Sequence, residues 1–171
     1  MNEAVYELLN QQIMHEFYSA YLYLDFADFF DAEGLKGYAN WYRVQAQEEL
    51  SHGMKFIHYL LENAEEVTLD TIQKPTWQGE ETRTVQAVLR LGLNHEKHVT
   101  RLIEAICQKA EEVGDRRTLH FLDWFIAEQA EEESNANDML TKFWLFGGDY
   151  SSLYLLDREL AGRTFSPDTA A

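Results

Sequence analysis

The stretch Gln45–His52, which reads QAQEELSH, places Glu49 and His52 three residues apart. At that spacing both side chains project from adjacent turns on one face of a helix. The flanking segments are rich in Tyr, Phe, Leu and Trp, so this face is expected to point into a core. A carboxylate and an imidazole at such a position need a chemical partner, because an unpaired buried charge is costly.

Four long helical segments and one short segment account for most of the chain. Only two Pro and nine Gly interrupt the 171 residues, and several glycines stand where helices are expected to end. The expected helices are 3–33, 37–65, 84–113 and 115–146, followed by a short fifth helix. Ser151 or Ser152 is expected to cap the start of that fifth helix, and Gly162 ends it. The pattern predicts an all-α fold.

The connection 66–83 contains Pro75 and Gly79 and has no helical period. If extended it reaches about 60 Å, whereas each long helix is about 45 Å long. It can therefore cross the whole bundle and make the second and third helices parallel, while the two short turns make their helix pairs antiparallel. We expect a four-helix bundle with one long crossover, formed by residues 1–165, and a flexible C-terminal tail at 166–171.

Each long segment carries an apolar stripe at steps of three and four residues, which is typical of a helix that faces a bundle core. Every stripe is interrupted near its middle by a carboxylate, and these acids are Glu16, Glu49, Glu96 and Glu132. No Lys or Arg interrupts the stripes, so two divalent cations would balance the four charges. Neutral His52 would add a nitrogen ligand. The pattern predicts a dinuclear site for Fe(II), Mn(II) or Zn(II).

The chain resembles the bacterial non-haem members of the ferritin family over nearly its whole length. The resemblance is carried by HEFYSAYLY at 15–23, AQEELSHG at 46–53, NHEKH at 94–98 and AEQAEEES at 127–134. It implies that one iron ion binds Glu16, Glu49 and His52. A second would bind Glu96 and Glu132, with Glu49 bridging the two ions.

The resemblance also implies roles for residues around this centre. Gln129 matches a glutamine beside the centre, and Tyr23 matches a site tyrosine that can donate an electron. Trp124 is a weaker match for that role, and core packing explains it more simply. A third iron site is implied at Glu48, Glu128, Glu131 and Glu132. A solvated acidic surface explains the same residues, and this alternative stays open.

The function that the resemblance implies is iron storage and detoxification by a ferroxidase. Such a protein oxidises Fe(II) to Fe(III) with O₂ or H₂O₂ and keeps the ferric mineral in a hollow shell of twenty-four identical subunits. Leu153, Leu156 and Leu160 of the fifth helix would line the fourfold axes of the shell. Two other functions stay open, namely a di-metal oxygenase or peroxidase and a non-catalytic metal buffer or structural bundle.

Several positions depart from related families. Haem-containing bacterioferritin has a second His on the fourth helix and a Met after the bridging Glu, where this chain has Glu132 and Leu50, so no haem is expected. Leu119 and Leu122 stand where the threefold channels of animal ferritins are acidic. Other acids and histidines are interpreted as solvated, surface or packing residues: Glu111, Glu112, Asp115, His15, His58, His95, His98 and His120.

Thirty acidic and fourteen basic residues give a net charge of −16, which repels nucleic acid and anionic membranes and attracts cations. The single Cys107 can form no internal disulfide, which favours a reducing compartment. The N-terminal MNEAVYELL lacks a signal-peptide pattern. The apolar run YLYLDFADFF is broken by Asp25 and Asp28. We expect a cytoplasmic protein without nucleic-acid or membrane partners.

Overall fold

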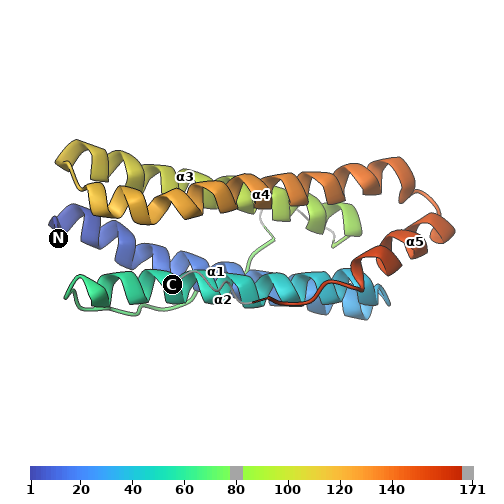
Figure 1. Ribbon diagram of the computed structural model, residues 1–171. Coiled ribbons are helices and arrows are strands. Elements are labelled where there is room, and N and C mark those ends of the chain that lie inside the picture. Colours follow the sequence, from blue (N-terminus) through green and yellow to red (C-terminus); the bar gives the residue numbers. More distant parts are fainter. Residues whose placement is uncertain (78–82, 167–171) are drawn as a thin grey trace.

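The computed structural model describes residues 1–77 and 83–166, and these contain five helices and no strand. The helices are α1 (Glu3–Ala32), α2 (Lys36–Glu62), α3 (Val85–Val113), α4 (Arg116–Phe146) and α5 (Tyr150–Leu160). Figure 1 shows α1 antiparallel to α2, α3 antiparallel to α4, and α5 at one end of the bundle. Because α2 and α3 run in the same direction, the expected long crossover is confirmed. Gly79 of the crossover and residues 167–171 of the expected tail lie outside the described residues.

Side chains cap most of the helix N-termini, which leaves few backbone amides without acceptors. Asn2, Thr84, Asp115 and Asp149 cap α1, α3, α4 and α5. Asp149 accepts from the backbone amides of Ser151 and Ser152. The prediction that one of these serines is the cap was therefore wrong, because the carboxylate just before them accepts from their amides. At the other end of α2 the helix stops at Glu62, since Ala64 adopts a positive φ of 59°.

The start of α2 is capped by a residue that is distant in the sequence. Its own N-cap residue, Leu35, offers no side-chain acceptor. Instead Oδ1 of the buried Asp157 on α5 accepts from the backbone amides of Gly37 at 2.8 Å and Tyr38 at 3.0 Å. Gly37 permits this approach, because a Cβ atom there would lie 1.6 Å from the carbonyl oxygen of Asp157. This contact docks α5 onto the beginning of α2.

The crossover is tied to α1 at both of its described ends. Asn10 and the backbone of Thr68 exchange two hydrogen bonds of 2.9 Å. At the far end, the indole of Trp77 donates to Asp25 at 2.6 Å and packs against Phe26 with ring centroids 5.7 Å apart. The described part of the crossover, up to residue 77, therefore lies along α1.

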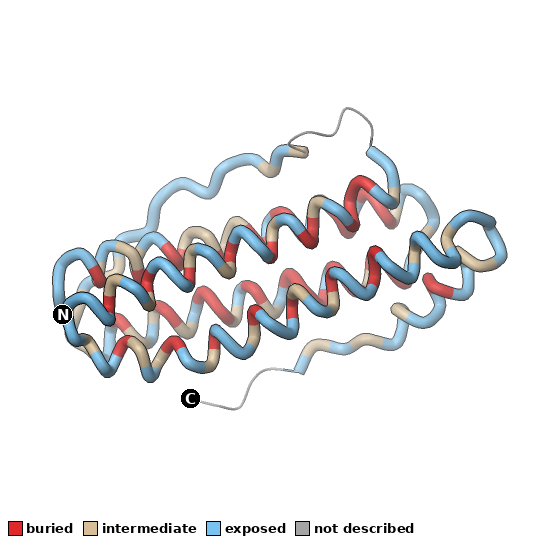
Figure 2. The backbone as a smooth tube through the Cα atoms, turned by 90° about the horizontal axis from the view of Figure 1, so that it is seen from above, coloured by how far each residue is buried: buried red, intermediate tan, exposed pale blue. Residues whose placement is uncertain are grey.

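A polar layer divides the apolar core into two clusters. Figure 2 shows the buried residues on the helix faces that point into the bundle. Along the sequence of each long helix, residues of one cluster come before the layer and residues of the other come after it. Phe26, Phe30 and Tyr38 belong to one cluster, and Phe56 and Ile103 belong to the other. The buried residues of the layer are Gln12, Glu16, Ser19, Gln45, Glu49, His52, Glu96, Gln129 and Glu132.

The apolar side of α5 faces its own bundle. Leu156 is buried, and Leu153 and Leu160 pack against the same cluster. The expectation that these three leucines line a fourfold axis stays a prediction, because packing within the chain leaves Leu153 and Leu160 partly exposed. Tyr154 and Leu155 point outward instead. Within the described residues, no helix combines the length and apolar character that crossing a membrane requires.

Candidate metal centre

Glu16 on α1 and Glu49 and His52 on α2 bring three potential metal ligands together. One ligand atom from each lies within 4.8 Å of the other two, and all three residues are buried. His52 Nδ1 is 3.5 Å from Glu49 Oε2 and 3.9 Å from Glu16 Oε2. The i, i+3 spacing on α2 and the adjacent position of α1 thus produce the cluster that QAQEELSH suggests.

One oxygen of this cluster lacks a hydrogen-bond donor. Glu16 Oε1 accepts from Gln12 Nε2 at 2.8 Å. Glu16 Oε2 has no hydrogen-bond partner, and it is the one such buried side-chain atom among the described residues. Buried acceptors are almost always satisfied, so an orphan oxygen beside a carboxylate and an imidazole fits a cation ligand.

Glu96 on α3 and Glu132 on α4 lie beside this cluster, but they do not belong to the group of ligand atoms that lie within 4.8 Å of one another. Both are buried. The Tyr23 hydroxyl donates a hydrogen bond to Glu96 Oε1, and Gln129 Nε2 donates one to Glu96 Oε2 at 3.3 Å. Gln45 Nε2 donates to Glu132 Oε1 at 2.7 Å and to Glu49 Oε1 at 3.0 Å. All four long helices therefore contribute a carboxyl group to one layer.

Burial changes the charge of these carboxyl groups in the metal-free chain. Loss of hydration raises the pKa of Glu16 to about 8, and the nearby charge of Glu49 acts in the same direction. Burial and then Glu49 likewise raise the pKa of Glu132 to about 8. Burial, Glu49 and Glu132 raise the pKa of Glu96 well above its usual value. Burial therefore favours the protonated form of these three groups, and metal ions must displace their protons.

Glu49 and His52 form the ionised pair of the layer. Burial alone would raise the pKa of Glu49, but the hydrogen bond and positive charge of His52 outweigh burial and lower it. Burial opposes protonation of His52, yet the hydrogen bond and charge of Glu49, helped by Glu16, raise the His52 pKa to about 10. A metal ion at this position would take the place of the imidazole proton.

Two aromatic residues lie beside the layer. Tyr23 is buried, and burial followed by the charge of Glu96 raises its pKa well above the usual value, so it remains a neutral phenol. The Trp124 ring is 5.3 Å from the His52 ring and 4.8 Å from the Phe125 ring, and Lys55 lies over it at 4.3 Å. Packing accounts for these contacts of Trp124.

The acids that were predicted to hold a third metal ion are only partly gathered. Glu128 Oε1 is 3.9 Å from His52 Nε2, and Glu48 is close enough to Glu128 for their charges to interact. Glu131 is exposed on the next turn of α4. Glu48 is also ion-paired with Arg163, which follows α5.

Three residues of this region were missed by the sequence interpretation. Gln12 and Gln45 each stand four residues before a ligand, at Glu16 and Glu49, and donate to it. That i, i+4 spacing is visible in the sequence and could have identified both. Arg163 gave no such signal, because its partners Gln45 and Glu48 lie more than a hundred residues away.

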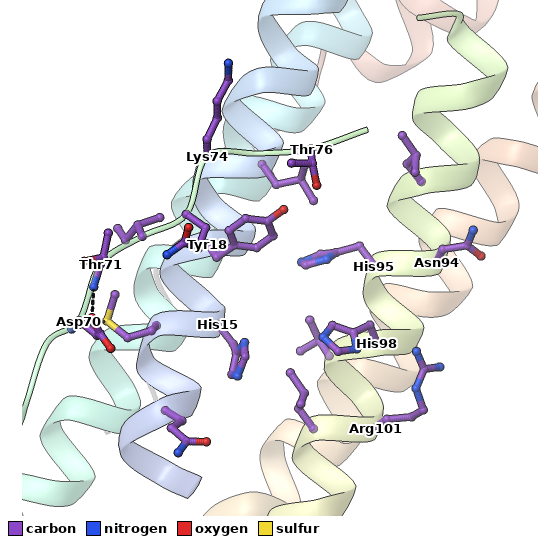
Figure 3. A pocket seen from close by; sticks show the side chains of 18 of the residues that line it. His15, Tyr18, Asp70, Thr71, Lys74, Thr76, Asn94, His95, His98 and Arg101 are labelled. Atoms are coloured by element: carbon purple, nitrogen blue, oxygen red, sulfur yellow. Dashed lines mark hydrogen bonds between the residues drawn. The ribbon is translucent and has the colours of Figure 1, made fainter. Parts of the chain in front are cut away.

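A groove of about 1050 Å³ lies between α1 and α3, next to the crossover. Figure 3 shows His15, His95 and His98 directed into it from the two facing helices. The ring centroids of His15 and His98 are 6.4 Å apart. His95 bonds to Ser19 Oγ at 2.8 Å and packs against Tyr23 at 5.8 Å, so it connects the groove to the polar layer.

Known proteins resemble this chain in sequence and in fold. Residues 6–145 match the family described as ferritin-like domain. A bacterial non-heme ferritin of Staphylococcus haemolyticus is 33% identical over 168 residues, which covers 98% of this chain and 99% of the relative. One from Staphylococcus epidermidis is 35% identical over 158 residues, or 92% of this chain and 93% of the relative. A solved structure of an engineered closed form of the Archaeoglobus fulgidus ferritin superposes with a TM-score of 0.92 at 42% identity, covering 97% of this chain and 99% of that one.

Proposed function

The chain belongs to the ferritin family, and from that premise we propose that it stores iron by oxidising Fe(II) at a two-metal centre within each subunit. Fe(II) is the substrate, O₂ or H₂O₂ is the oxidant, and a ferric mineral is the stored product. The observation that carries this proposal is the unpartnered Glu16 Oε2, which faces Glu49 and His52 in the interior. A buried carboxyl oxygen with no hydrogen-bond partner, close to a second carboxylate and an imidazole, is suited to a cation.

Each ion is assigned its own ligands. The first Fe(II) binds Glu16, Glu49 and His52, and the second binds Glu96 and Glu132, with Glu49 shared between them. The four deprotonated carboxylates balance two divalent ions, so a filled centre carries no net charge from these groups. Carboxylates with one imidazole suit Fe(II). No haem ligand is assigned, because Glu132 and Leu50 occupy the two positions that a haem-binding relative would need.

The electrons balance for either oxidant. Two Fe(II) ions that become two Fe(III) ions release two electrons. With two protons these convert O₂ to H₂O₂, or cleave the O–O bond of H₂O₂ to give two water molecules. Tyr23 is assigned to orient Glu96, because its hydroxyl donates a hydrogen bond to one oxygen of that ligand. Gln129 holds the other oxygen of Glu96.

A third iron ion is assigned to Glu48, Glu128, Glu131 and Glu132. The proximity of Glu128 to His52 supports this assignment, since it places one of these acids at the edge of the two-metal centre. The third ion would bind at lower occupancy than the first two, because Glu131 is exposed and Glu48 is already paired.

The mineral requires a closed container, and we propose a shell of twenty-four identical subunits in the cytoplasm. Exposed apolar residues support assembly, since patches of this kind on soluble proteins mark interfaces. They gather at the end of α4 and on α5: Trp144, Leu145, Phe146, Tyr150, Tyr154 and Leu155. Cys107 is a free thiol, which agrees with a reducing compartment.

The test is an anaerobic Fe(II) titration of the metal-free protein, followed by O₂ with optical and oxygen-electrode readouts. Rapid oxidation of two Fe(II) per chain and mineralisation of excess iron are expected. Glu49→Gln removes the shared ligand and should abolish the rapid phase, whereas Glu104→Gln, an exposed acid on α3, should behave like the parent. Uptake without oxidation would instead indicate a metal buffer, and oxidation without mineralisation an oxygenase or peroxidase.

A further inference from the structure

The segment that follows α5 returns along α2 and is anchored there. Asn40 Nδ2 donates to the carbonyl oxygens of Ala161 at 3.3 Å and Arg163 at 2.9 Å. The Arg163 guanidinium lies over the Trp41 ring at 4.2 Å and donates to the Trp41 carbonyl oxygen at 3.4 Å. The backbone and the side chain of Arg163 are therefore both held against α2.

The head of Arg163 reaches the edge of the polar layer. Its Nη2 is ion-paired with Glu48 Oε2, and its Nη1 donates to Gln45 Oε1 at 2.8 Å. Because that oxygen of Gln45 is taken, its Nε2 faces Glu49 and Glu132 and donates to both. One amide thus separates the guanidinium from two carboxylates of the proposed two-metal centre.

Arg163 therefore already supplies a positive charge beside Glu48. Arg163 and Glu48 are both about three-quarters shielded from solvent, with 23% and 22% of their side chains exposed. A divalent ion bound to Glu48 would meet the fixed positive charge of the guanidinium at contact distance. Like charges this close repel strongly where water is partly excluded, so the ion and Arg163 compete for one carboxylate.

We propose that Arg163 is the resident cation of the third metal site, and that a third metal ion binds Glu48 only when the segment after α5 releases it. This inference rests on the proposed third site at Glu48, Glu128, Glu131 and Glu132. Release also uncovers the Trp41 ring, so the arrival of a third ion changes the surroundings of that tryptophan. Arg163 thereby limits how readily the third site fills.

Zn(II) calorimetry on the metal-free assembled protein tests this competition. Arg163→Gln is expected to bind the third ion about tenfold more tightly than the parent, because the competing charge is gone. Arg163→Lys retains a charge and should stay close to the parent. Arg158→Gln removes an exposed charge from α5 itself and is the matched control. Unchanged size-exclusion and circular-dichroism profiles establish that each variant is folded and assembled.

Tryptophan fluorescence supplies an independent readout. In Trp124→Phe, which lacks the indole beside His52, the third equivalent of Zn(II) should change the emission, and this change should disappear when Trp41→Phe or Arg163→Gln is added. An emission change at the third equivalent that survives the addition of Trp41→Phe overturns the proposed release of the segment.

The outcomes separate this inference from the function on which it rests. A third ion that binds the parent and Arg163→Gln with equal affinity leaves the third site standing and overturns the role of Arg163. If the parent and every variant bind two ions and no third, both the third site and the proposed role of Arg163 are refuted. Failure to bind any ion refutes the two-metal centre itself.

Discussion

At the scale of single residues, the amide of Gln12 is the donor that satisfies one oxygen of Glu16. Outer residues that orient a ligand change metal affinity by about 10–100-fold. We expect Gln12→Met, which keeps the length of the side chain but removes the donor, to weaken binding of the first Zn(II) ion about tenfold by calorimetry. Gln11→Met alters the exposed neighbour and should have no effect. Equal affinities in the two variants would show that Gln12 only fills space.

The pKa values of the layer predict how pH acts on stability. Glu16 and Glu132 have pKa values near 8 in the fold, against an ordinary value of 4.5. The folded chain therefore holds protons that the unfolded chain has released, and the metal-free protein loses stability as the pH rises from about 4.5 to about 8. The protonated His52, with its pKa near 10, adds stability that is lost as the pH rises through that value.

Metal binding has the opposite dependence on pH, because each ion must expel those protons. The rise in melting temperature caused by Zn(II) is therefore expected to be larger at about pH 8 than at about pH 5.5. Differential scanning calorimetry of the metal-free and Zn(II)-loaded protein at both pH values measures it. A metal-induced rise that is the same at both values would mean that neither the layer carboxyl groups nor His52 releases protons when the metal binds.

Much of the site could be predicted from residue spacing. Glu49 and His52 are related by one helical turn, and the carboxylates that interrupt the other stripes could be placed at the same depth. The direction of each oxygen could not be predicted, since it depends on neighbours such as Tyr23, which turns Glu96. Arg163 illustrates the same limit, because its position follows from where α5 docks and not from its own neighbours in the chain.

At the scale of helices, the contact between Gly37 and Asp157 holds α5 against α2. Gly37→Ala would force a methyl group against the carbonyl oxygen of Asp157. We expect it to reduce the free energy of unfolding by about 1–3 kcal/mol or to displace α5. Gly148→Ala is the matched control, because nothing lies within 4 Å of its added Cβ. Thermal unfolding of both variants measures the difference, and equal melting temperatures would contradict the close packing.

The helices themselves were predictable to within a few residues, because glycine ends and long apolar stripes are local signals. α3 and α4 begin and end within one residue of their predicted bounds. The cap of α2 was not predictable in this way. Asp157 lies 120 residues from Gly37, and only the folded arrangement of α5 brings its carboxylate to those amides.

At the scale of the whole molecule, the exposed apolar end formed by α4 and α5 predicts assembly. We expect a particle of several hundred kDa by size-exclusion chromatography with light scattering. Leu155→Arg places a charge on this exposed surface and should shift the particle toward smaller species. Two-ion Zn(II) binding should persist in that variant, since the centre lies within one subunit. A parent protein that remains monomeric at all salt concentrations would contradict the shell.

The long crossover also has a consequence for the order of folding. The α1–α2 hairpin closes through a short turn and alone contains Glu16, Glu49 and His52, whereas Glu96 and Glu132 belong to the α3–α4 hairpin. Local contacts form faster than distant ones, because a long loop costs more entropy to close. Half of the centre can therefore assemble as soon as the first hairpin forms. The second ion has its ligands only after the two hairpins dock. The rate at which it binds during refolding therefore measures the rate of that last docking step.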